Sequence, residues 1–224
     1  MMNRVLFSCC VWCLTLLGFA TPHFSADPEA MPSIGSNREL FVDRFLVQQL
    51  TNARLQLHEP RDEGMVIALN QPWEGPHSGY STVIRDGDLL RMYYRGISKP
   101  GLDGNENERT CYAESRDGIH WIKPSLGIYE FEGSRENNLV LDRFAPITHN
   151  FCPFLDTRPG VSAEERYKGV GGTGRELYGL ISADGLHWKK LQEQPILSSA
   201  DVSIPHTHLF DSQNLAFWSS EEEC

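Results

Sequence analysis

The sequence predicts an all-β fold built from four-stranded antiparallel sheets, and three observations support this prediction. First, Ser-Arg-Asp-Gly-Ile-His-Trp at 115–121 returns 67 residues later as Ser-Ala-Asp-Gly-Leu-His-Trp at 182–188. Second, an apolar or aromatic run precedes each copy, which indicates a strand entering a tight Asp-Gly turn and a strand returning from it. Third, no long stretch has helical periodicity. We therefore expect a structural motif, with Trp121 and Trp188 packed over the turn or between neighbouring sheets.

The stretch before the repeats predicts three strands. Residues 39–47 are apolar and β-prone, residues 53–58 alternate between apolar and polar, and residues 65–69 form a short apolar run. Residues 71–79 are rich in Pro and Gly, which is typical of a loop.

Two four-stranded units and the beginning of a third follow. The first unit covers 80–141, with strands at 80–84, 89–94, 110–115 and 138–141 and an Asp-Gly hairpin turn. The second unit covers 149–197, with strands at 149–155, 166–170, 177–182 and 195–197. The third unit begins at 208 and continues to Trp218.

Four-stranded units at this period are typical of the blades of a β-propeller. Each blade buries its sheet faces against its neighbours, and a closed ring takes roughly four to eight blades. Residues 39–224 hold about two complete blades plus partial ones. The sequence therefore predicts part of a β-propeller domain, either an open fragment or a truncated reading of a longer protein, and the abrupt acidic end favours truncation.

The N-terminal residues predict a secreted or periplasmic protein. Residues 1–20 resemble a secretory signal, because an almost wholly apolar run follows Arg4 and small residues precede a cleavage point after Ala20. Cleavage after Ala26 is a second option. The apolar run is short for a membrane span, so no stable span is expected after cleavage. Residues 21–38 predict a linker or an irregular arm.

Composition limits the partners and the cofactors. The chain of 224 residues has a formal net charge of −10 and no basic cluster, which argues against a nucleic-acid partner. Nucleotide, dinucleotide and Cys-x-x-Cys motifs are absent, so no cofactor is expected. After signal removal Cys111, Cys152 and Cys224 remain. Cys111 and Cys152 either form one bridge or are two buried free thiols.

Four stretches of the sequence resemble a family. Residues 39–46, 93–96, 111–121 and 211–218 are similar to secreted bacterial proteins related to the five-bladed propeller glycoside hydrolases of the family 32, 43 and 130 types. The repeated motif also resembles the Asp box of sialidases but lacks the residue between Asp and Gly. The resemblance implies a five-bladed propeller and hydrolysis of a glycosidic bond by a carboxylate pair, one acting as nucleophile or base and one as general acid.

The family's Asn-Asp-Pro-Asn-Gly and Arg-Asp-Pro motifs are absent, so candidate carboxylates are chosen by their place in the blades. Asp211 begins the first strand of the third unit, with a strand-entry cap as the alternative role. Asp43 lies in a β-prone run, with an ion pair to Arg44 or Arg95 as the alternative. Glu74 lies beside an aromatic residue before the first blade, with an ordinary Pro-rich loop as the alternative.

Polar and aromatic residues near the starts of the blades are candidates for binding carbohydrate, since a sugar ring stacks on an aromatic face and its hydroxyls need polar partners. The candidates are Trp73, Tyr80, Arg95, His149, Asn150, Gln213 and Asn214. His206 and His208 form a His-x-His pair that could bind a metal, but this signal is too weak to predict a metal site. If a funnel lacks two carboxylates, a non-catalytic carbohydrate- or protein-binding fragment, or an inactive truncation, becomes the better interpretation.

Overall fold

A computed structural model of the chain describes residues 33–35, 39–201 and 209–224. The predicted signal peptide (1–20) lies outside these residues, as do His206, His208 and the predicted arm (21–38) except for 33–35. The chain divides into two compact units, 1–60 and 61–224. All of the strands lie in the second unit, and the one helical turn of the described residues is the 3₁₀ turn Ala163–Glu165. No helix in the described part of the chain is both long and apolar enough to span a membrane.

The strands predicted at 39–47, 53–58 and 65–69 are wrong, because the structure has no strand in these ranges. Leu40 is 83 % exposed and Leu57 is 96 % exposed, so the apolar side chains of the first two ranges are not covered by a core. Alternation of apolar and polar residues makes a strand only where another strand supplies its hydrogen bonds. Ile67 and Leu69 of the third range instead pack, as irregular chain, against the first sheet.

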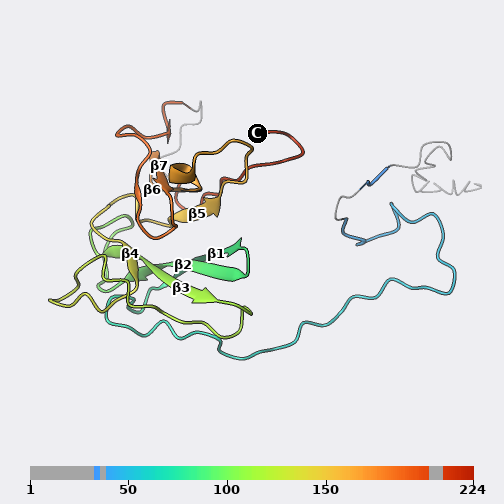
Figure 1. Ribbon diagram of the computed structural model, residues 1–224, viewed down its shortest axis with the longest axis horizontal. Helices are drawn as coiled ribbons and strands as arrows, with labels where there is room; N and C mark the ends of the chain where they lie inside the picture. Colours follow the sequence, from blue (N-terminus) through green and yellow to red (C-terminus); the bar gives the residue numbers. More distant parts are fainter. Residues whose placement is uncertain (1–32, 36–38, 202–208) are drawn as a thin grey trace, which may run out of the picture. The chain divides into compact units, whose positions relative to one another are not determined.

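The first sheet matches the predicted first unit (Figure 1). It contains β1 (Gly79–Asp86), β2 (Leu89–Ile97), β3 (Glu108–Ser115) and β4 (Leu139–Leu141), in that order and antiparallel throughout. The β1–β2 hairpin turns at Gly87, whose φ of 61° lies in the left-handed region that glycine adopts without strain.

The second sheet repeats this order. It contains β5 (Cys152–Leu155), β6 (Tyr167–Thr173), β7 (Glu176–Ser182) and β8 (Lys189–Lys190), and β9 (Leu197–Ser198) pairs with the far end of β7. The sequence predicts that a strand returns from the second repeated turn, and β8 is this strand. The strand predicted at the start of the third unit is wrong over 209–218, because these described residues form no strand. This segment packs on β6 and β7 through Phe210, without a strand partner of its own.

The register of the two sheets shows which residues are equivalent. Tyr93 of β2 pairs with Thr82 of β1, and Val170 of β6 pairs with Cys152 of β5. Tyr80 and Asn150, each two residues earlier, therefore hold equivalent places. Both have left-handed backbone, with φ of 50° for Tyr80 and 51° for Asn150. The repeat thus extends to an unusual backbone conformation at the start of each sheet.

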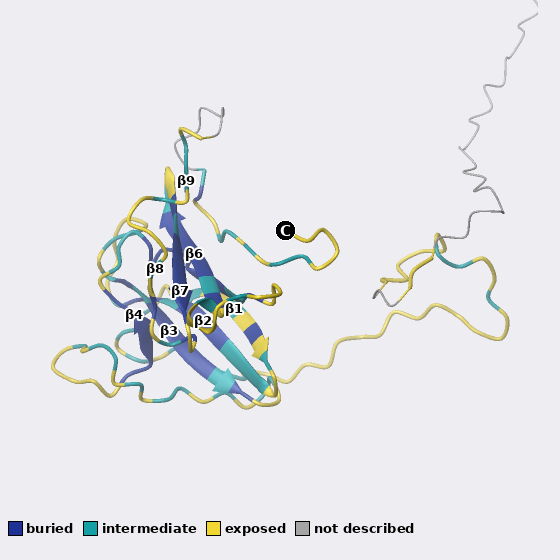
Figure 2. Cartoon of the chain, turned by 45° about the horizontal axis from the view of Figure 1, so that its top comes forward, coloured by how far each residue is buried: buried dark blue, intermediate teal, exposed yellow. Residues whose placement is uncertain are grey.

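The two sheets share one hydrophobic core, and Figure 2 shows that burial is concentrated in their strands. Tyr93 of the first sheet meets Trp188, beside the second sheet, in an edge-to-face contact. The same geometry joins Tyr93 to Tyr112 and Trp188 to Phe151. The Tyr93 hydroxyl donates a hydrogen bond to the Gly185 carbonyl at 2.9 Å. A second cluster covers the opposite face of the first sheet, around Tyr94.

The three cysteines of the described residues are not bridged. Cys111 and Cys152 are buried free thiols, and Cys224 is an exposed free thiol. Of the two alternatives that the sequence left open, the structure therefore has the free thiols. Cys111 belongs to the core cluster around Tyr94, and the Thr82 hydroxyl lies 3.3 Å from the Cys152 sulfur.

Candidate functional site

Four predicted binding residues meet where strands of the two sheets begin or end. Tyr80 begins β1, Arg95 lies near the end of β2, and His149 and Asn150 come just before β5. We call Tyr80, Arg95, His149 and Asn150 the strand-end cluster. The Arg95 guanidinium carbon lies 4.6 Å from the centre of the Tyr80 ring. Arg95 also donates a hydrogen bond to Asn150 Oδ1 at 2.8 Å, which links the two sheets.

The strand-end cluster also holds the segment that follows the second sheet. Asn150 Nδ2 donates to the main-chain carbonyl of Asp211 at 2.9 Å, and His149 Nε2 lies 3.2 Å from the same oxygen. The left-handed backbone of Asn150 is tolerated best by Asn among residues with a side chain. Asp211 is therefore held beside the cluster by its backbone, while the residue itself is exposed.

A buried ion pair lies behind the cluster. His149 Nδ1 is 2.9 Å from Glu108 Oε2, and both residues are almost completely buried. Burial opposes a charge on His149, but the hydrogen bond and the charge of Glu108 outweigh it, so the pKa of His149 is raised. The second nitrogen of the ring, Nε2, remains directed at Asp211 and Asn150. The ring is thus oriented by a carboxylate on one side and faces the cluster on the other.

Gln213 joins the same region. Its Nε2 donates to the Thr82 hydroxyl at 2.6 Å, and Thr82 lies beside Cys152. Segments starting at 79, 149 and 211 therefore meet side by side. Asn214, in contrast, bonds within its own segment, to the carbonyl oxygens of Phe210 and Ser212.

The strand-end cluster can bind a polar ligand. The Tyr80 side chain is partly open, since the residue is 42 % exposed. Nε of Arg95 is buried and has no hydrogen-bond partner within the described residues. A half-exposed aromatic ring and a guanidinium therefore lie side by side, and the exposed residue Asp211 joins the cluster through its main-chain carbonyl. This combination offers a flat apolar surface together with donors and acceptors in fixed positions.

The structure places Glu74 and Trp73 elsewhere, in a buried network. Glu74 is completely buried, and its carboxylate accepts hydrogen bonds from the Tyr94 hydroxyl, the Gln71 amide and Lys123. Lys123 Nζ lies 2.7 Å from Glu74 Oε1. A carboxylate whose two oxygens are occupied in this way is suited to holding the loop before β1 against the first sheet.

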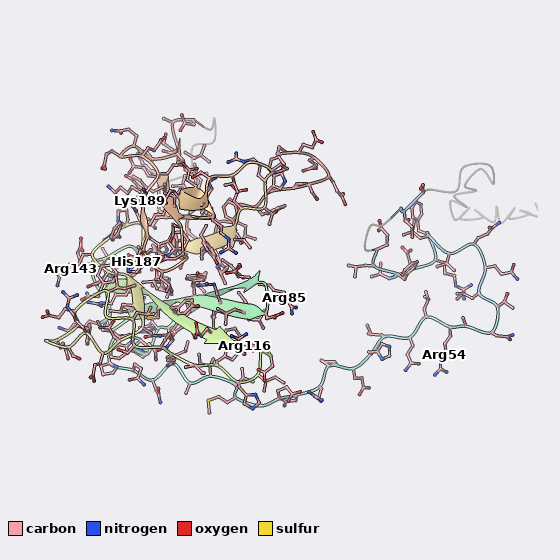
Figure 3. The ribbon with its side chains drawn as sticks, in the orientation of Figure 1. Arg54, Arg85, Arg116, Arg143, His187 and Lys189 are labelled. Atoms are coloured by element: carbon pink, nitrogen blue, oxygen red, sulfur yellow. The ribbon has the colours of Figure 1, made fainter. Side chains whose placement is uncertain are left out.

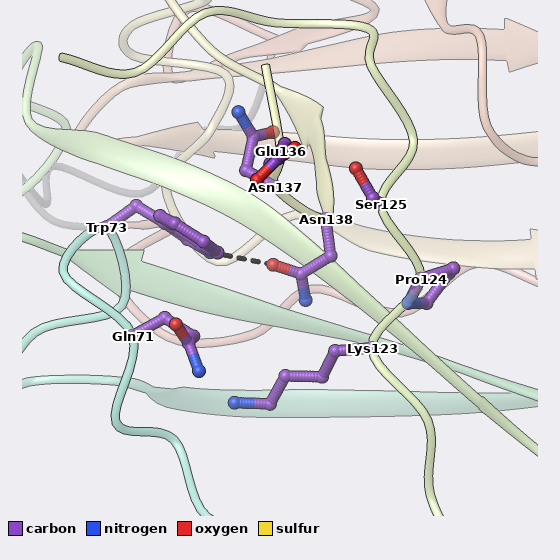
Figure 4. Close-up of a pocket in the computed structure, with 8 residues that line it drawn as sticks. All are labelled: Gln71, Trp73, Lys123, Pro124, Ser125, Glu136, Asn137 and Asn138. Atoms are coloured by element: carbon purple, nitrogen blue, oxygen red, sulfur yellow. Dashed lines mark hydrogen bonds between the residues drawn. The ribbon is translucent and has the colours of Figure 1, made fainter. Parts of the chain in front are cut away.

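A small pocket opens beside this network, and Figure 4 shows it. The pocket has a volume of about 180 Å³. The Trp73 indole nitrogen donates to Asn138 Oδ1 at 2.7 Å across it. Its lining is mostly polar and includes Gln71, Lys123, Ser125, Glu136 and Asn137. Trp73 is thus anchored to the first sheet, apart from the strand-end cluster.

Asp43 belongs to the first compact unit, 1–60. Its carboxylate accepts a hydrogen bond from the Phe45 amide at 2.8 Å, which is a local turn contact between exposed residues. The ion pair with Arg44 that the sequence allowed is not among the ion pairs of the described residues.

Sequence reasoning missed Glu108 and Lys123. Glu108 lies in a polar stretch that predicts a loop, but it is the first residue of β3 and is buried beside His149. Lys123 follows the first motif and reaches Glu74, 49 residues earlier in the chain. The polar sequence around Glu108 gives no sign of a strand, because β3 extends to Glu108 only through its pairing with Ile97 of β2.

Exposed basic side chains of the described residues come from different elements. Arg85 belongs to β1 and Arg116 to the first motif, whereas Lys189, on β8, lies away from both in Figure 3. The expectation that the chain has no nucleic-acid partner stays a prediction.

Comparisons with known proteins identify no family for the chain and two solved structures that resemble part of it. No protein-family model matches the chain, and no curated protein sequence is similar to it. The chain is similar in structure to a glycosyl hydrolase from Bacteroides ovatus, with a TM-score of 0.35 and 16 % identity over 54 % of this chain. A protein assigned to the glycoside hydrolases of the same species gives 0.33 and 19 % over 53 %. The matched parts are 32 % and 33 % of those two chains.

Proposed function

We propose that the chain is part of a secreted, glycan-active β-propeller protein and that its strand-end cluster binds a saccharide. One observation carries this proposal. Tyr80, Arg95, His149 and Asn150, which come from two sheets and three segments, meet in direct contact, with Gln213 close by. Ligand sites of this kind combine an apolar surface with a few convergent polar groups.

The chemistry of the strand-end cluster suits a sugar. The partly open Tyr80 ring offers a face for the C–H groups of a pyranose or furanose ring. The guanidinium of Arg95 can donate to vicinal hydroxyls. Asn150 is 2 % exposed and its carboxamide is already bonded to Arg95 and to Asp211, so its part is to hold Arg95 in place. Arg95 is held between the Tyr80 ring and Asn150, so little conformational entropy is lost when a ligand binds it.

Hydrolysis of a glycosidic bond is the second candidate, and the position of Asp211 favours it. Asp211 is an exposed carboxylate whose backbone is fixed by His149 and Asn150. Glu108 is a second carboxylate on the far side of the His149 ring. Asp211 would act on the sugar directly, with Glu108 setting the charge of His149. Glu74 is a weaker choice, because its oxygens are occupied and buried.

Glycan binding by the purified chain tests the proposal. We expect the chain to bind members of a panel of plant and bacterial oligosaccharides. Tyr80→Ala should weaken the binding by about tenfold, which corresponds to about 1.4 kcal/mol. Tyr178→Ala is the matched control, because Tyr178 is a partly exposed tyrosine of β7 whose hydroxyl bonds to Glu176.

Two outcomes would contradict the proposal. One is the absence of binding to every glycan of the panel, and the other is an equal loss of affinity in the Tyr80 and Tyr178 variants. Release of reducing sugar that disappears in Asp211→Asn, while glycan binding remains, would show hydrolysis in addition to binding. Unchanged release in that variant would remove Asp211 from the mechanism.

A further inference from the structure

A group of three potential metal ligands lies next to the strand-end cluster. One carboxylate oxygen each of Asp103 and Glu108 and one ring nitrogen of His149 all lie within 4.8 Å of one another. His149 and Glu108 are buried, and Asp103 is exposed. This is the one group of three such residues found in the described part of the chain. We propose that Asp103, Glu108 and His149 bind one divalent transition-metal ion, such as Zn²⁺.

The separation of the two buried groups fits two neighbouring ligands of one ion. His149 Nδ1 and Glu108 Oε2 are 2.9 Å apart. Two ligands at metal distances of about 2.1 Å lie about 3 Å apart at the right angle of an octahedral site and about 3.4 Å apart at the tetrahedral angle that zinc prefers, so the two groups need to separate by about 0.5 Å to bind zinc. The ion would replace the proton that the two groups share. That proton moves to Nε2 of the ring or, from a charged ring, to solvent.

The Glu108 carboxylate is held in place by a backbone hydrogen bond, and the turn that carries Asp103 is held by its packing. The Gly104 amide donates to Glu108 Oε1 at 3.1 Å, which leaves Oε2 directed at His149. Gly104 has a φ of 72°, and a Cβ there would lie 2.6 Å from Thr173 Cγ2. The turn that carries Asp103 is thus pressed against the end of β6, on the same side of the molecule as His149.

The donor set decides the kind of ion. One imidazole nitrogen with two carboxylate oxygens suits zinc and other first-row ions, whereas calcium and magnesium prefer sites made of oxygen alone. Asp103 is exposed, so the ion has a path from solvent to the two buried ligands. The bound ion would join the loop before β3 to the segment before β5. This inference does not rest on saccharide binding, although it uses the same His149.

Titration of the chelator-treated full chain with Zn²⁺ alone tests the site. Isothermal titration calorimetry should show binding, and a thermal melt should show a higher unfolding temperature with the ion. Asp103→Asn should lower the affinity by at least about tenfold, since even outer partners of metal ligands contribute that much. Because Asp103 is exposed, the Asp103→Asn substitution should leave the melting temperature of the metal-free chain unchanged. Glu106→Gln is the matched control, as an exposed acid of the same loop.

The exposed pairs Asp117–His120 and Asp184–His187 could bind Zn²⁺ on their own. The number of bound ions separates these pairs from the proposed site. We expect Asp103→Asn to remove one ion per chain at equilibrium dialysis, while Glu106→Gln removes none. If the wild-type chain binds no Zn²⁺, or if Asp103→Asn binds as many ions with the same affinity as the wild type, the proposal is wrong.

Discussion

The two copies of the repeated turn have the same internal bonds but different surroundings. In each copy the Gly amide donates to the Ser hydroxyl at 2.9 Å, and the His amide donates to the Asp carboxylate at 2.8 Å. Each Trp indole donates to the Gly carbonyl of its own turn. The Gly residues have φ of 79° and 77°. The turn is therefore made by its own seven residues.

The surroundings differ because, within the described residues, the second copy packs against the other sheet, whereas the first copy packs on its own sheet. Trp188 is 7 % exposed and packs on Tyr93 and Phe151. Trp121 is half-buried over the other face of the first sheet, and Ile122 after it is 65 % exposed. The seven residues of the motif therefore determine the conformation of the turn. The neighbouring sheet determines how much the turn contributes to the stability of the fold.

Replacement of the two tryptophans should give the largest contrast. Trp188→Ala should lower the free energy of unfolding by about 3–5 kcal/mol, because it opens a cavity between the two sheets. Trp121→Ala should lower it by roughly half as much, since part of that side chain is already in water. Urea denaturation of the two variants measures both values. Equal losses would contradict the view that the neighbouring sheet determines the contribution.

Replacement of the two glycines should give a smaller contrast. Alanine at either position takes left-handed backbone, at a cost of roughly 1–2 kcal/mol. At Gly185 the new Cβ would also lie 2.6 Å from the Tyr93 hydroxyl, whereas at Gly118 the nearest atom is 3.4 Å away. We expect Gly185→Ala to lose about 1–3 kcal/mol more than Gly118→Ala in urea denaturation. If Gly118→Ala is the less stable variant, the contact between a Cβ at residue 185 and the Tyr93 hydroxyl does not determine the difference in stability.

The acid sensitivity of the two turns should be the same. The hydrogen bond with His120 lowers the pKa of Asp117, and at Asp184 the bonds with His187 outweigh burial and lower the pKa as well. A carboxyl whose folded pKa is depressed stabilises the fold above the usual value of 3.8, and this contribution is lost as pH falls towards the folded pKa.

Asp117→Asn and Asp184→Asn should therefore each reduce the loss of stability between pH 6 and pH 3, by similar amounts. Urea denaturation at the two pH values measures this reduction. A large effect in one variant alone would show that packing, as well as the turn, determines the strength of these bonds.

Sequence reasoning predicted the parts of the fold that local chemistry determines. The strands predicted at 80–84, 89–94, 110–115, 138–141, 166–170 and 177–182 correspond to β1, β2, β3, β4, β6 and β7. The strand predicted at 149–155 begins only at Cys152, the one at 195–197 is a strand only at Leu197, and the return after the first motif is a single bridge between Glu114 and Ile122. The strands predicted at 39–69 and at 209–218 are wrong, although their residues are β-prone. A strand needs a partner, and the presence of a partner is a property of the whole chain.

Like the fold, the candidate site could be predicted from the sequence only in part. The place of His149 and Asn150 at the start of a predicted strand suggested a ligand role; the structure has them just before β5 and brings them to Tyr80 and Arg95. The burial of Glu74 was not predictable, because its partner Lys123 comes from the first motif. Whether these residues bind carbohydrate stays a prediction.

The two buried thiols have a practical consequence, because they can report when each part of the molecule opens. Burial raises the pKa of both Cys111 and Cys152, so neither forms a reactive thiolate while it is enclosed. A thiol reagent then reacts at the rate at which the surrounding structure opens. Cys111 lies on β3 and Cys152 begins β5, so the order in which they react tells which sheet loosens first. Each sheet thus contains its own thiol reporter of local opening, without any added label.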